Sequence, residues 1–137
     1  LWSLPIVYVI ENNHYAMGTS VERSAAETHL YKRGVSFRIP GEEVDGMDVL
    51  AVREAGARAA EHARSGKGPY ILERKTYRYR GHSMSDPAKY RTKEEVDEVK
   101  KTRDPIDPLR ERLEKNGWAD EAAMKAVDAE VKKIVAD

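Results

Sequence analysis

The stretch Ile6-Val7-Tyr8-Val9-Ile10-Glu11-Asn12-Asn13 decides the fold class. Its first five residues are apolar without interruption, and the apolar run stops abruptly at Glu11. Continuous rather than alternating apolarity is typical of a strand that is covered on both faces, as in a parallel sheet. In open α/β sheets, ligands bind just beyond the carboxyl ends of such strands. The segment from Asn12 to Gly18 is therefore a candidate site loop.

Helix and strand signals alternate downstream of this strand. A short helix is predicted from about Val21, and a short strand is predicted over residues 36–39. Asp48 has the character of a helix N-cap, and the small apolar residues that follow it at helical spacing indicate a helix packed closely on a sheet. Residues 70–76 form the next predicted strand. The order strand, helix, strand indicates a right-handed crossover, so the fold class is α/β with a parallel sheet.

A polar loop and a charged tail complete the predicted organisation. Residues 77–91 lack both the helical and the strand periodicity, and long loops of this kind are usually functional or disordered. We expect residues 79–90 to become ordered only when an anion holds their cations. Residues 93–137 show helix caps and apolar stripes and predict a helical tail. Two parts are thus expected, a domain over residues 1–92 that includes the loop and a tail over residues 93–137.

Bulk composition excludes several classes of function. The 137 residues contain 24 Lys and Arg and 24 Asp and Glu, so no charge excess calls for nucleic acid or a membrane surface. Cysteine is absent, which excludes a disulfide framework and thiolate chemistry. The sequence starts at Leu1 without a Met or a basic leader and runs almost at once into a strand, so we expect a fragment cut inside a domain. A processed natural N-terminus is the alternative.

Asn12 and Asn13 are the first candidates for chemistry. A carboxamide oxygen is a hard neutral ligand that suits Mg²⁺ or Ca²⁺, and the backbone carbonyl of Tyr15 could add a second one. Neither group carries charge, so a divalent ion also needs a carboxylate from elsewhere. The alternative is that this Asn pair only forms a turn, because Asn favours turns and left-handed backbone geometry.

His82 is the second candidate, because it lies in a loop with several cations that include Arg78. Clustered cations beside a histidine suit a diphosphate or a carboxylate. The alternative is a solvated loop whose cations pair with acids such as Glu73 and Asp86. A serine hydrolase is rejected, since Ser83 next to His82 in sequence does not provide the required geometry. Phosphorylation of the loop is more plausible, since added negative charge would disturb an anion site.

Five motifs in the same order resemble the α subunits of thiamine-diphosphate-dependent 2-oxoacid dehydrogenases (E1), and the likeness extends through Tyr90-Arg91-Thr92 and the tail. They are Glu11-Asn12-Asn13-His14-Tyr15-Ala16-Met17-Gly18-Thr19-Ser20, Tyr31-Lys32-Arg33-Gly34, Val44-Asp45-Gly46-Met47-Asp48, Arg64-Ser65-Gly66-Lys67-Gly68-Pro69 and Tyr77-Arg78-Tyr79-Arg80-Gly81-His82-Ser83-Met84-Ser85-Asp86-Pro87.

The resemblance implies roles for four residues. Asn13 would bind Mg²⁺ through its side chain and Tyr15 through its backbone carbonyl. His82 would contact the cofactor diphosphate and take part in acyl transfer, and Arg78 would help to order the loop. The Gly-Asp-Gly start of the family's cofactor motif does not occur in this sequence, so the anionic ligand is missing and the chain alone is expected to be inactive.

The reaction implied is decarboxylation of a 2-oxoacid, followed by transfer of the acyl group to the lipoyl groups of E2, in an α2β2 assembly with the E1 β subunit. The loop motif is most similar to that of the pyruvate dehydrogenases, with branched-chain 2-oxoacid and acetoin dehydrogenases as alternatives. Ser20 and Ser83 match positions that are phosphorylated in mitochondrial members. A third such serine has no counterpart near residues 88–90, which favours the bacterial cytoplasm over the mitochondrial matrix. A self-associating fragment without catalytic activity and a helical interaction module over 93–137 stay open.

Overall fold

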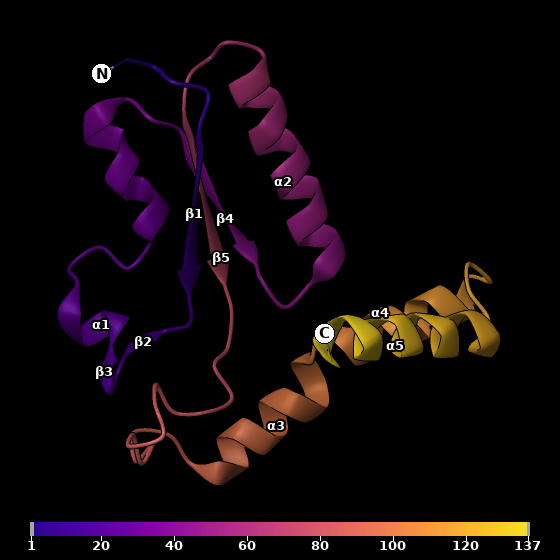
Figure 1. Cartoon of the computed structure of the whole chain (residues 1–137). Coiled ribbons are helices and arrows are strands. Elements are labelled where there is room, and N and C mark those ends of the chain that lie inside the picture. Colours follow the sequence, from indigo (N-terminus) through magenta and orange to yellow (C-terminus); the bar gives the residue numbers. More distant parts are fainter. Residues whose placement is uncertain (1, 137) are drawn as a thin grey trace. The chain divides into compact units, whose positions relative to one another are not determined.

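Three parallel strands form the sheet of the computed structural model, which describes residues 2–136 (Figure 1). The strand order is β1 (Val7–Asn12), β5 (Tyr70–Lys75) and β4 (Gly41–Asp45), so the last strand in the sequence lies in the centre. Both neighbours run parallel to β5 along their whole length. The predicted α/β fold with a parallel sheet is confirmed.

Helix α2 (Val49–Arg64) connects β4 to β5 and covers one face of the sheet. Asp48 caps it as predicted, since its side chain accepts hydrogen bonds from the backbone N–H groups of Leu50 and Ala51. The residues that face the sheet are small and four apart, namely Ala55, Ala59 and Ala63, and all three are buried. Because an alanine extends little from the backbone, the helix can approach the strands closely.

The other face is covered by the 3-10 helix η1 (Leu30–Phe37). The prediction of a strand over residues 36–39 is therefore wrong. The helix ends at Arg38, which takes left-handed geometry with φ of 56°, and the strand begins only at Gly41, in the acidic segment of β4. Acidic residues have low strand propensity, so the packing of β4 against β5 overrides the local preference.

Gly34 and Gly56 offer a matched pair of alanine substitutions. A Cβ atom at Gly34 would lie 2.5 Å from the backbone oxygen of Ile39 and 2.7 Å from Cδ1 of Ile71, whereas one at Gly56 would meet nothing within 4 Å. We expect Gly34→Ala to destabilise the full-length protein by about 1–3 kcal/mol through overpacking. Gly56→Ala should stabilise it by about 0.5–1 kcal/mol, because alanine favours a helix interior. Urea unfolding of both variants measures the difference, and equal midpoints would contradict the close packing.

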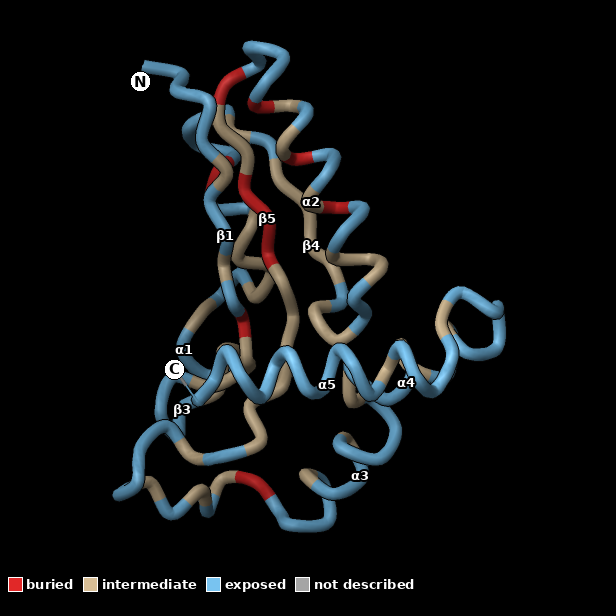
Figure 2. Tube along the Cα trace, turned by 45° about the vertical axis from the view of Figure 1, so that its right-hand side comes forward, coloured by how far each residue is buried: buried red, intermediate tan, exposed pale blue. Residues whose placement is uncertain are grey.

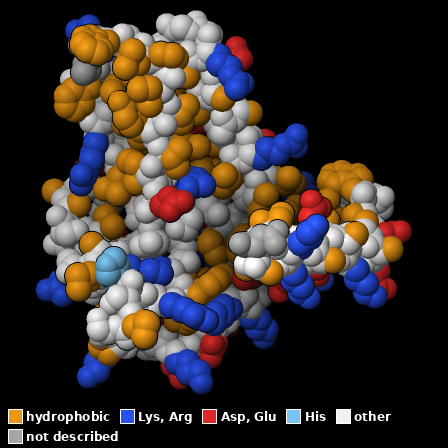
Figure 3. Space-filling view, viewed as in Figure 1, with side chains coloured by type: hydrophobic (Ala, Val, Ile, Leu, Met, Phe, Trp, Pro, Cys, Tyr) orange, Lys and Arg blue, Asp and Glu red, His pale blue; other side chains and the backbone are white. Residues whose placement is uncertain are grey.

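Strand β1 lies at one edge of the sheet and is more exposed than its sequence predicts. Tyr8 is 50% and Val9 51% exposed, and Figure 2 shows the contrast with the buried centre of β5. Apolar side chains gather over the region of β1 and η1 (Figure 3). Cover on both faces of β1 is therefore not found within the described residues.

A small hairpin follows β1. Strands β2 (Tyr15–Ala16) and β3 (Thr19–Ser20) pair antiparallel, and the four-residue helix α1 (Val21–Ser24) continues from β3. The helix predicted from about Val21 is confirmed, although Ser20 occupies its N-cap and makes no side-chain cap bond.

The C-terminal region is helical as predicted. It contains α3 (Lys93–Arg103), α4 (Ile106–Lys115) and α5 (Glu121–Ala136). Residues up to Thr102 form one compact unit and those from Arg103 a second, in which an ion pair joins Arg110 to Asp128 at 3.0 Å. The predicted domain boundary at residue 92 stays a prediction. None of the helices in the described part of the chain has the length and apolarity to cross a bilayer.

Candidate active site

Two site loops meet at the carboxyl edge of the sheet. Asn12, the last residue of β1, is in register with Lys75, the last residue of β5. The hairpin with Tyr15 therefore starts beside the loop over residues 77–91, as expected for the ligand-binding edge of a parallel sheet. Contacts between the loops are direct, since Arg78 donates a hydrogen bond of 2.9 Å to the carbonyl oxygen of Met17.

The turn from Asn12 to Tyr15 has a defined backbone. Asn12 is 4% exposed, and its Oδ1 accepts a 3.0 Å hydrogen bond from the N–H of His14, which adopts left-handed geometry with φ of 69°. Val21 donates to the carbonyl oxygen of His14, so the next pair, Tyr15 and Ser20, is the non-hydrogen-bonded pair of the hairpin. The carbonyl of Tyr15 consequently points away from β3 and stays available as a ligand.

Asn13 differs from Asn12 in its surroundings. Its side chain is half-buried, and no hydrogen bond or ion pair within residues 2–136 uses it. Asn12 therefore carries the structural role that the turn interpretation assigns to the pair. Asn13 and the carbonyl of Tyr15 remain as two neutral oxygen donors on one turn.

Arg91 holds the second loop. Its guanidinium lies 5.9 Å from the ring centre of Tyr15 and 5.2 Å from those of Tyr77 and Tyr90. It donates hydrogen bonds to the carbonyl oxygens of Arg78 and Arg80, and the residue is only 9% exposed. A planar guanidinium can serve two carbonyls and several ring faces at once. Arg91 thus links the start and the end of the loop to the hairpin.

Arg78 and His82 lie side by side in this loop. Besides Met17, Arg78 bonds to the hydroxyl of Tyr90 at 2.9 Å, and its Nη1 lies 3.5 Å from Nδ1 of His82. A ring that accepts at Nδ1 carries its proton on Nε2, from which it can donate to an anion. The ring of His82 is exposed, and so is accessible to a ligand.

Internal hydrogen bonds join the parts of the loop in this structure, and the expectation that an anion orders residues 79–90 stays a prediction. In the alternative interpretation, loop cations pair with Glu73 and Asp86. Among the described residues no ion pair joins either acid to a loop cation, although the charge of Arg78 contributes to the lowered pKa of Asp86. Glu73 bonds to Asn12 and to the backbone of Tyr31, and Asp86 accepts hydrogen bonds from the N–H groups of His82 and Ala88 and from the hydroxyl of Tyr90. These hydrogen bonds lower the pKa of Asp86 from 3.8 to about 2, and the bonds from the backbone N–H groups of His82 and Ala88 contribute most.

We expect Asp86→Asn to loosen the loop. An amide keeps one acceptor oxygen and presents an NH₂ group to donors that the carboxylate satisfied. Because the folded pKa is depressed, the Asp86 contribution is fully present above about pH 3.8 and fades as the pH falls toward 2. The cleavage rate by chymotrypsin near Tyr79, measured at neutral pH on the full-length subunit, should rise. Asp97→Asn, an exposed change in α3, is the control, and equal rates in both variants would contradict the role of Asp86.

The two candidate phosphorylation sites lie in the two loops. Ser20 ends β3, and its carbonyl oxygen accepts from the hydroxyl of Ser24 at 3.1 Å. Ser83 is exposed, and its hydroxyl lies 3.0 Å from that of Ser85. No hydrogen bond among the described residues joins Ser83 to the ring of His82.

Arg91 is the main site residue that sequence reasoning missed. Its position in the Tyr90-Arg91-Thr92 motif was part of the family resemblance, but no local pattern indicated a buried arginine. The available signal was the group of tyrosines at 15, 77, 79 and 90, because aromatic faces attract guanidinium groups.

A parallel α/β sheet with two neutral oxygen donors on a turn and a cationic loop at its carboxyl edge has the arrangement in which α/β proteins bind ligands. Comparison with known proteins identifies the family. The sequence profile described as "Dehydrogenase E1 component" matches residues 1–137, and the chain belongs to this family.

Relatives include α subunits of the pyruvate dehydrogenase E1 component from bacteria and mitochondria. That of Rhizobium meliloti (strain 1021) is 60% identical over 137 residues, which is 100% of this chain and 39% of the relative. The testis-specific mitochondrial form of Rattus norvegicus is 56% identical over 98% of this chain and 34% of its own length. The somatic mitochondrial form of Homo sapiens is 54% identical over 100% of this chain and 35% of its own length. The chain thus spans little more than a third of these relatives.

Proposed function

We propose that this chain is part of the α subunit of a pyruvate dehydrogenase E1 component, which decarboxylates pyruvate and transfers the acetyl group to lipoyl groups of E2. One observation carries the proposal. In a chain of the E1 family, the turn with Asn13 and Tyr15 and the loop with Arg78 and His82 are held together at the edge of the sheet where ligands bind.

The residues present fit thiamine diphosphate with Mg²⁺. Asn13 has an unengaged carboxamide, and the carbonyl of Tyr15 is directed away from its hairpin partner. Mg²⁺ prefers such oxygen ligands and usually also takes a carboxylate and phosphate oxygens. The residues from 2 to 136 contain no cluster of three His, Cys, Asp or Glu that could hold a metal. By resemblance, the anionic ligand would come from the Gly-Asp-Gly part of the family motif, which does not occur in this sequence.

Arg78, His82 and Ser83 of the second loop have proposed roles toward the diphosphate. The cofactor supplies the electron sink for decarboxylation when it is bound. His82 would donate a hydrogen bond to the diphosphate, and Arg78, which bonds to Met17 and Tyr90, would hold the ring of His82 in place. By resemblance, His82 would also take part in the transfer of the acyl group to the lipoyl acceptor. Phosphorylation at Ser83 would place charge beside the anion and oppose its binding.

The proposed partners follow from the family. We expect an α2β2 assembly with the E1 β subunit, which provides the carboxylate that activates the cofactor, and transfer to the dihydrolipoyl acyltransferase E2. No nucleic acid or membrane partner is proposed. The bacterial cytoplasm is the proposed compartment, with the mitochondrial matrix as the alternative, and the relatives include both bacterial and mitochondrial forms.

Substrate assays on the full-length α subunit with its β partner test the function. We expect decarboxylation of pyruvate to exceed that of branched-chain 2-oxoacids at least tenfold in kcat/KM. A preference for branched-chain 2-oxoacids or for acetoin would replace pyruvate dehydrogenase by the corresponding alternative. Absence of all three activities in the assembled protein would defeat the proposal.

The isolated chain of 137 residues should bind thiamine diphosphate and Mg²⁺ weakly or not at all. Asn13 and Tyr15 provide only neutral oxygens, and the partner subunit is absent. Calorimetric titration of the isolated chain measures this, and micromolar affinity would contradict the expectation.

A further inference from the structure

Glu73 is a buried acid in the middle of the central strand. It is 0% exposed, and no ion pair among residues 2–136 includes it. It lies on the face of β5 that is turned toward η1, together with Ile71 and Lys75. A buried carboxylate is stable only when its oxygens are bonded to donors. The identity of these donors indicates what Glu73 does.

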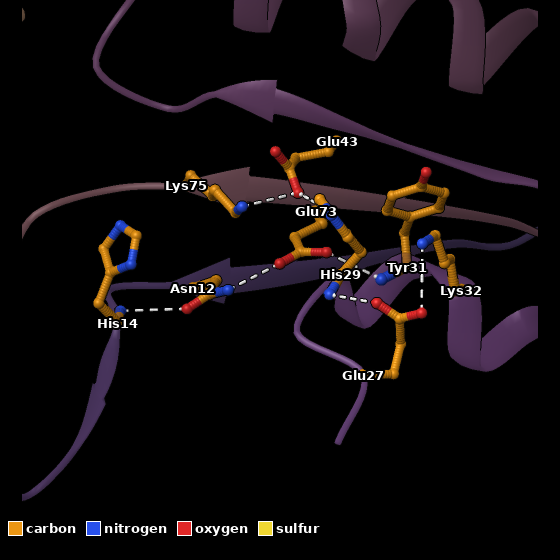
Figure 4. A network of polar contacts seen from close by, with 9 residues as sticks. All are labelled: Asn12, His14, Glu27, His29, Tyr31, Lys32, Glu43, Glu73 and Lys75. Carbon is orange, nitrogen blue, oxygen red and sulfur yellow. Dashed lines mark hydrogen bonds and ion pairs between the residues drawn. The ribbon is translucent and has the colours of Figure 1, made fainter. Parts of the chain in front are cut away.

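Both oxygens of Glu73 are engaged by other elements (Figure 4). Oε1 accepts a 2.7 Å hydrogen bond from Nδ2 of Asn12 at the end of β1, and Oε2 accepts a 2.9 Å hydrogen bond from the backbone N–H of Tyr31. Tyr31 lies in the first turn of η1, where helix N–H groups have no partner within the helix. The acid therefore ties the central strand to the edge strand and to the start of η1.

The bond to Glu73 determines the orientation of the Asn12 carboxamide. With Nδ2 directed at the acid, Oδ1 is the atom left to accept from the N–H of His14 at 3.0 Å. The reverse orientation would place two acceptors against each other at Glu73 and two donors at His14. The bond to Oδ1 holds His14 in left-handed geometry, with φ of 69°, between Asn13 and Tyr15.

We propose that Glu73 is the positioning residue for the metal-ligand turn. It acts through Asn12, whose carboxamide fixes the backbone that carries the Asn13 side chain and the Tyr15 carbonyl. This inference rests on the proposed function for its metal, but the positioning itself is a property of the protein without ligands. Glu73 is not a catalytic residue in this scheme.

The hydrogen-bond pattern predicts a specific rescue. Glu73→Gln leaves one acceptor for Tyr31 and presents an NH₂ group to the NH₂ group of Asn12. Asn12→Asp alone places two carboxylates at the distance of the present bond, which is 2.7 Å. In the double variant Glu73→Gln/Asn12→Asp, the glutamine donates to the aspartate and still accepts from Tyr31, while the other aspartate oxygen accepts from His14. The double variant thus restores the hydrogen bonds between residues 12 and 73, from Tyr31 and from His14, and the negative charge lies on residue 12 in place of residue 73.

Hydrogen exchange of the backbone amides at 13–16 tests this in the full-length α subunit with its β partner and without cofactor. Each single variant should exchange at least tenfold faster than the wild type, and the double variant should return to within threefold. Glu43→Gln is the control, since Glu43 is in register with Glu73 on the neighbouring strand but bonds to His29 and Lys75 instead. It should leave this segment unchanged.

Three results would overturn the inference: unchanged exchange in Glu73→Gln, no recovery in the double variant, or the same effect in Glu43→Gln. If Glu73→Gln fails to fold, recovery of folding in the double variant is the supporting result, and a double variant that also fails to fold overturns it. A titration of the same variants with Mg²⁺ and thiamine diphosphate separates the proposed function. The double variant could restore slow hydrogen exchange while the cofactor affinity of every variant stays within threefold of the wild type. That result would support the positioning role of Glu73 but exclude a metal-binding role for the turn.

Discussion

Arg91→Ala is expected to release the loop over residues 77–91 from the hairpin. The change removes two hydrogen bonds from a charged donor to the carbonyl oxygens of Arg78 and Arg80 and the contacts of the guanidinium with three tyrosine rings. Together these contacts stabilise the closed loop by roughly 3 kcal/mol. The population of open loop should therefore rise by more than about a hundredfold. Hydrogen exchange of residues 78–91 in the assembled enzyme without cofactor measures this rise.

Two further variants separate the geometry of Arg91 from its charge. Arg91→Lys keeps the cation but cannot serve two carbonyls with one planar group, so it should give an intermediate rate. Arg80→Ala is the control, because Arg80 is exposed and it is the backbone carbonyl of this residue that Arg91 contacts. If residues 78–91 exchange as slowly in Arg91→Ala as in Arg80→Ala, the contacts of the Arg91 guanidinium do not hold the loop.

Asn13→Ala is expected to abolish most of the Mg²⁺-dependent cofactor binding of the assembled enzyme. The carboxamide oxygen has no partner among residues 2–136, so its loss would remove the proposed metal ligand without breaking a hydrogen bond of the fold. We expect a loss of affinity for thiamine diphosphate of at least tenfold, about 1.4 kcal/mol, with little change in thermal stability.

The control for Asn13 is the same chemical change elsewhere in the chain. Asn116→Ala removes a carboxamide that bonds to the carbonyl oxygen of Arg112 at the end of α4 and should leave cofactor affinity unchanged. Calorimetric titration with the cofactor at several Mg²⁺ concentrations compares the two variants. A change of less than about threefold in Asn13→Ala, under ~0.7 kcal/mol, would rule out the metal-ligand role.

Much of the fold could be predicted from local patterns. The cap at Asp48 and the small residues of α2 have a signal within a few positions, and both interpretations are confirmed. The apolar run at Ile6 to Ile10 correctly predicted a strand, but not its exposure at the edge of the sheet. The prediction of a strand over residues 36–39 is wrong because the position of the true strand depends on contacts with distant residues. The acids of β4 are held by partners far along the chain, such as Arg58 and Lys75, which no local pattern shows.

The candidate site shows the same division. The Asn13 turn meets the His82 loop because β1 and β5 are adjacent parallel strands, and the local patterns did not predict this strand order. The contacts that hold the two loops were not predicted either. Arg91 and Tyr15 are brought together by the tertiary fold, and Glu73 was interpreted as a partner for loop cations. The roles of Asn13, Tyr15, Arg78 and His82 toward a cofactor stay predictions.

The position of β1 beside β5 also has a consequence for the order of folding. Residues paired between β4 and β5 are 30 positions apart, as with Gly41 and Ile71, whereas those between β1 and β5 are 63 apart, as with Val7 and Tyr70. Doubling the length of a closed loop costs about 0.6 kcal/mol more in chain entropy. We therefore expect β4, α2 and β5 to assemble first and β1 to join a preformed strand. Since the turn with Asn13 and Tyr15 extends from β1, we expect the proposed binding site to be completed late, after the segment around Glu73 is already in place to receive Asn12.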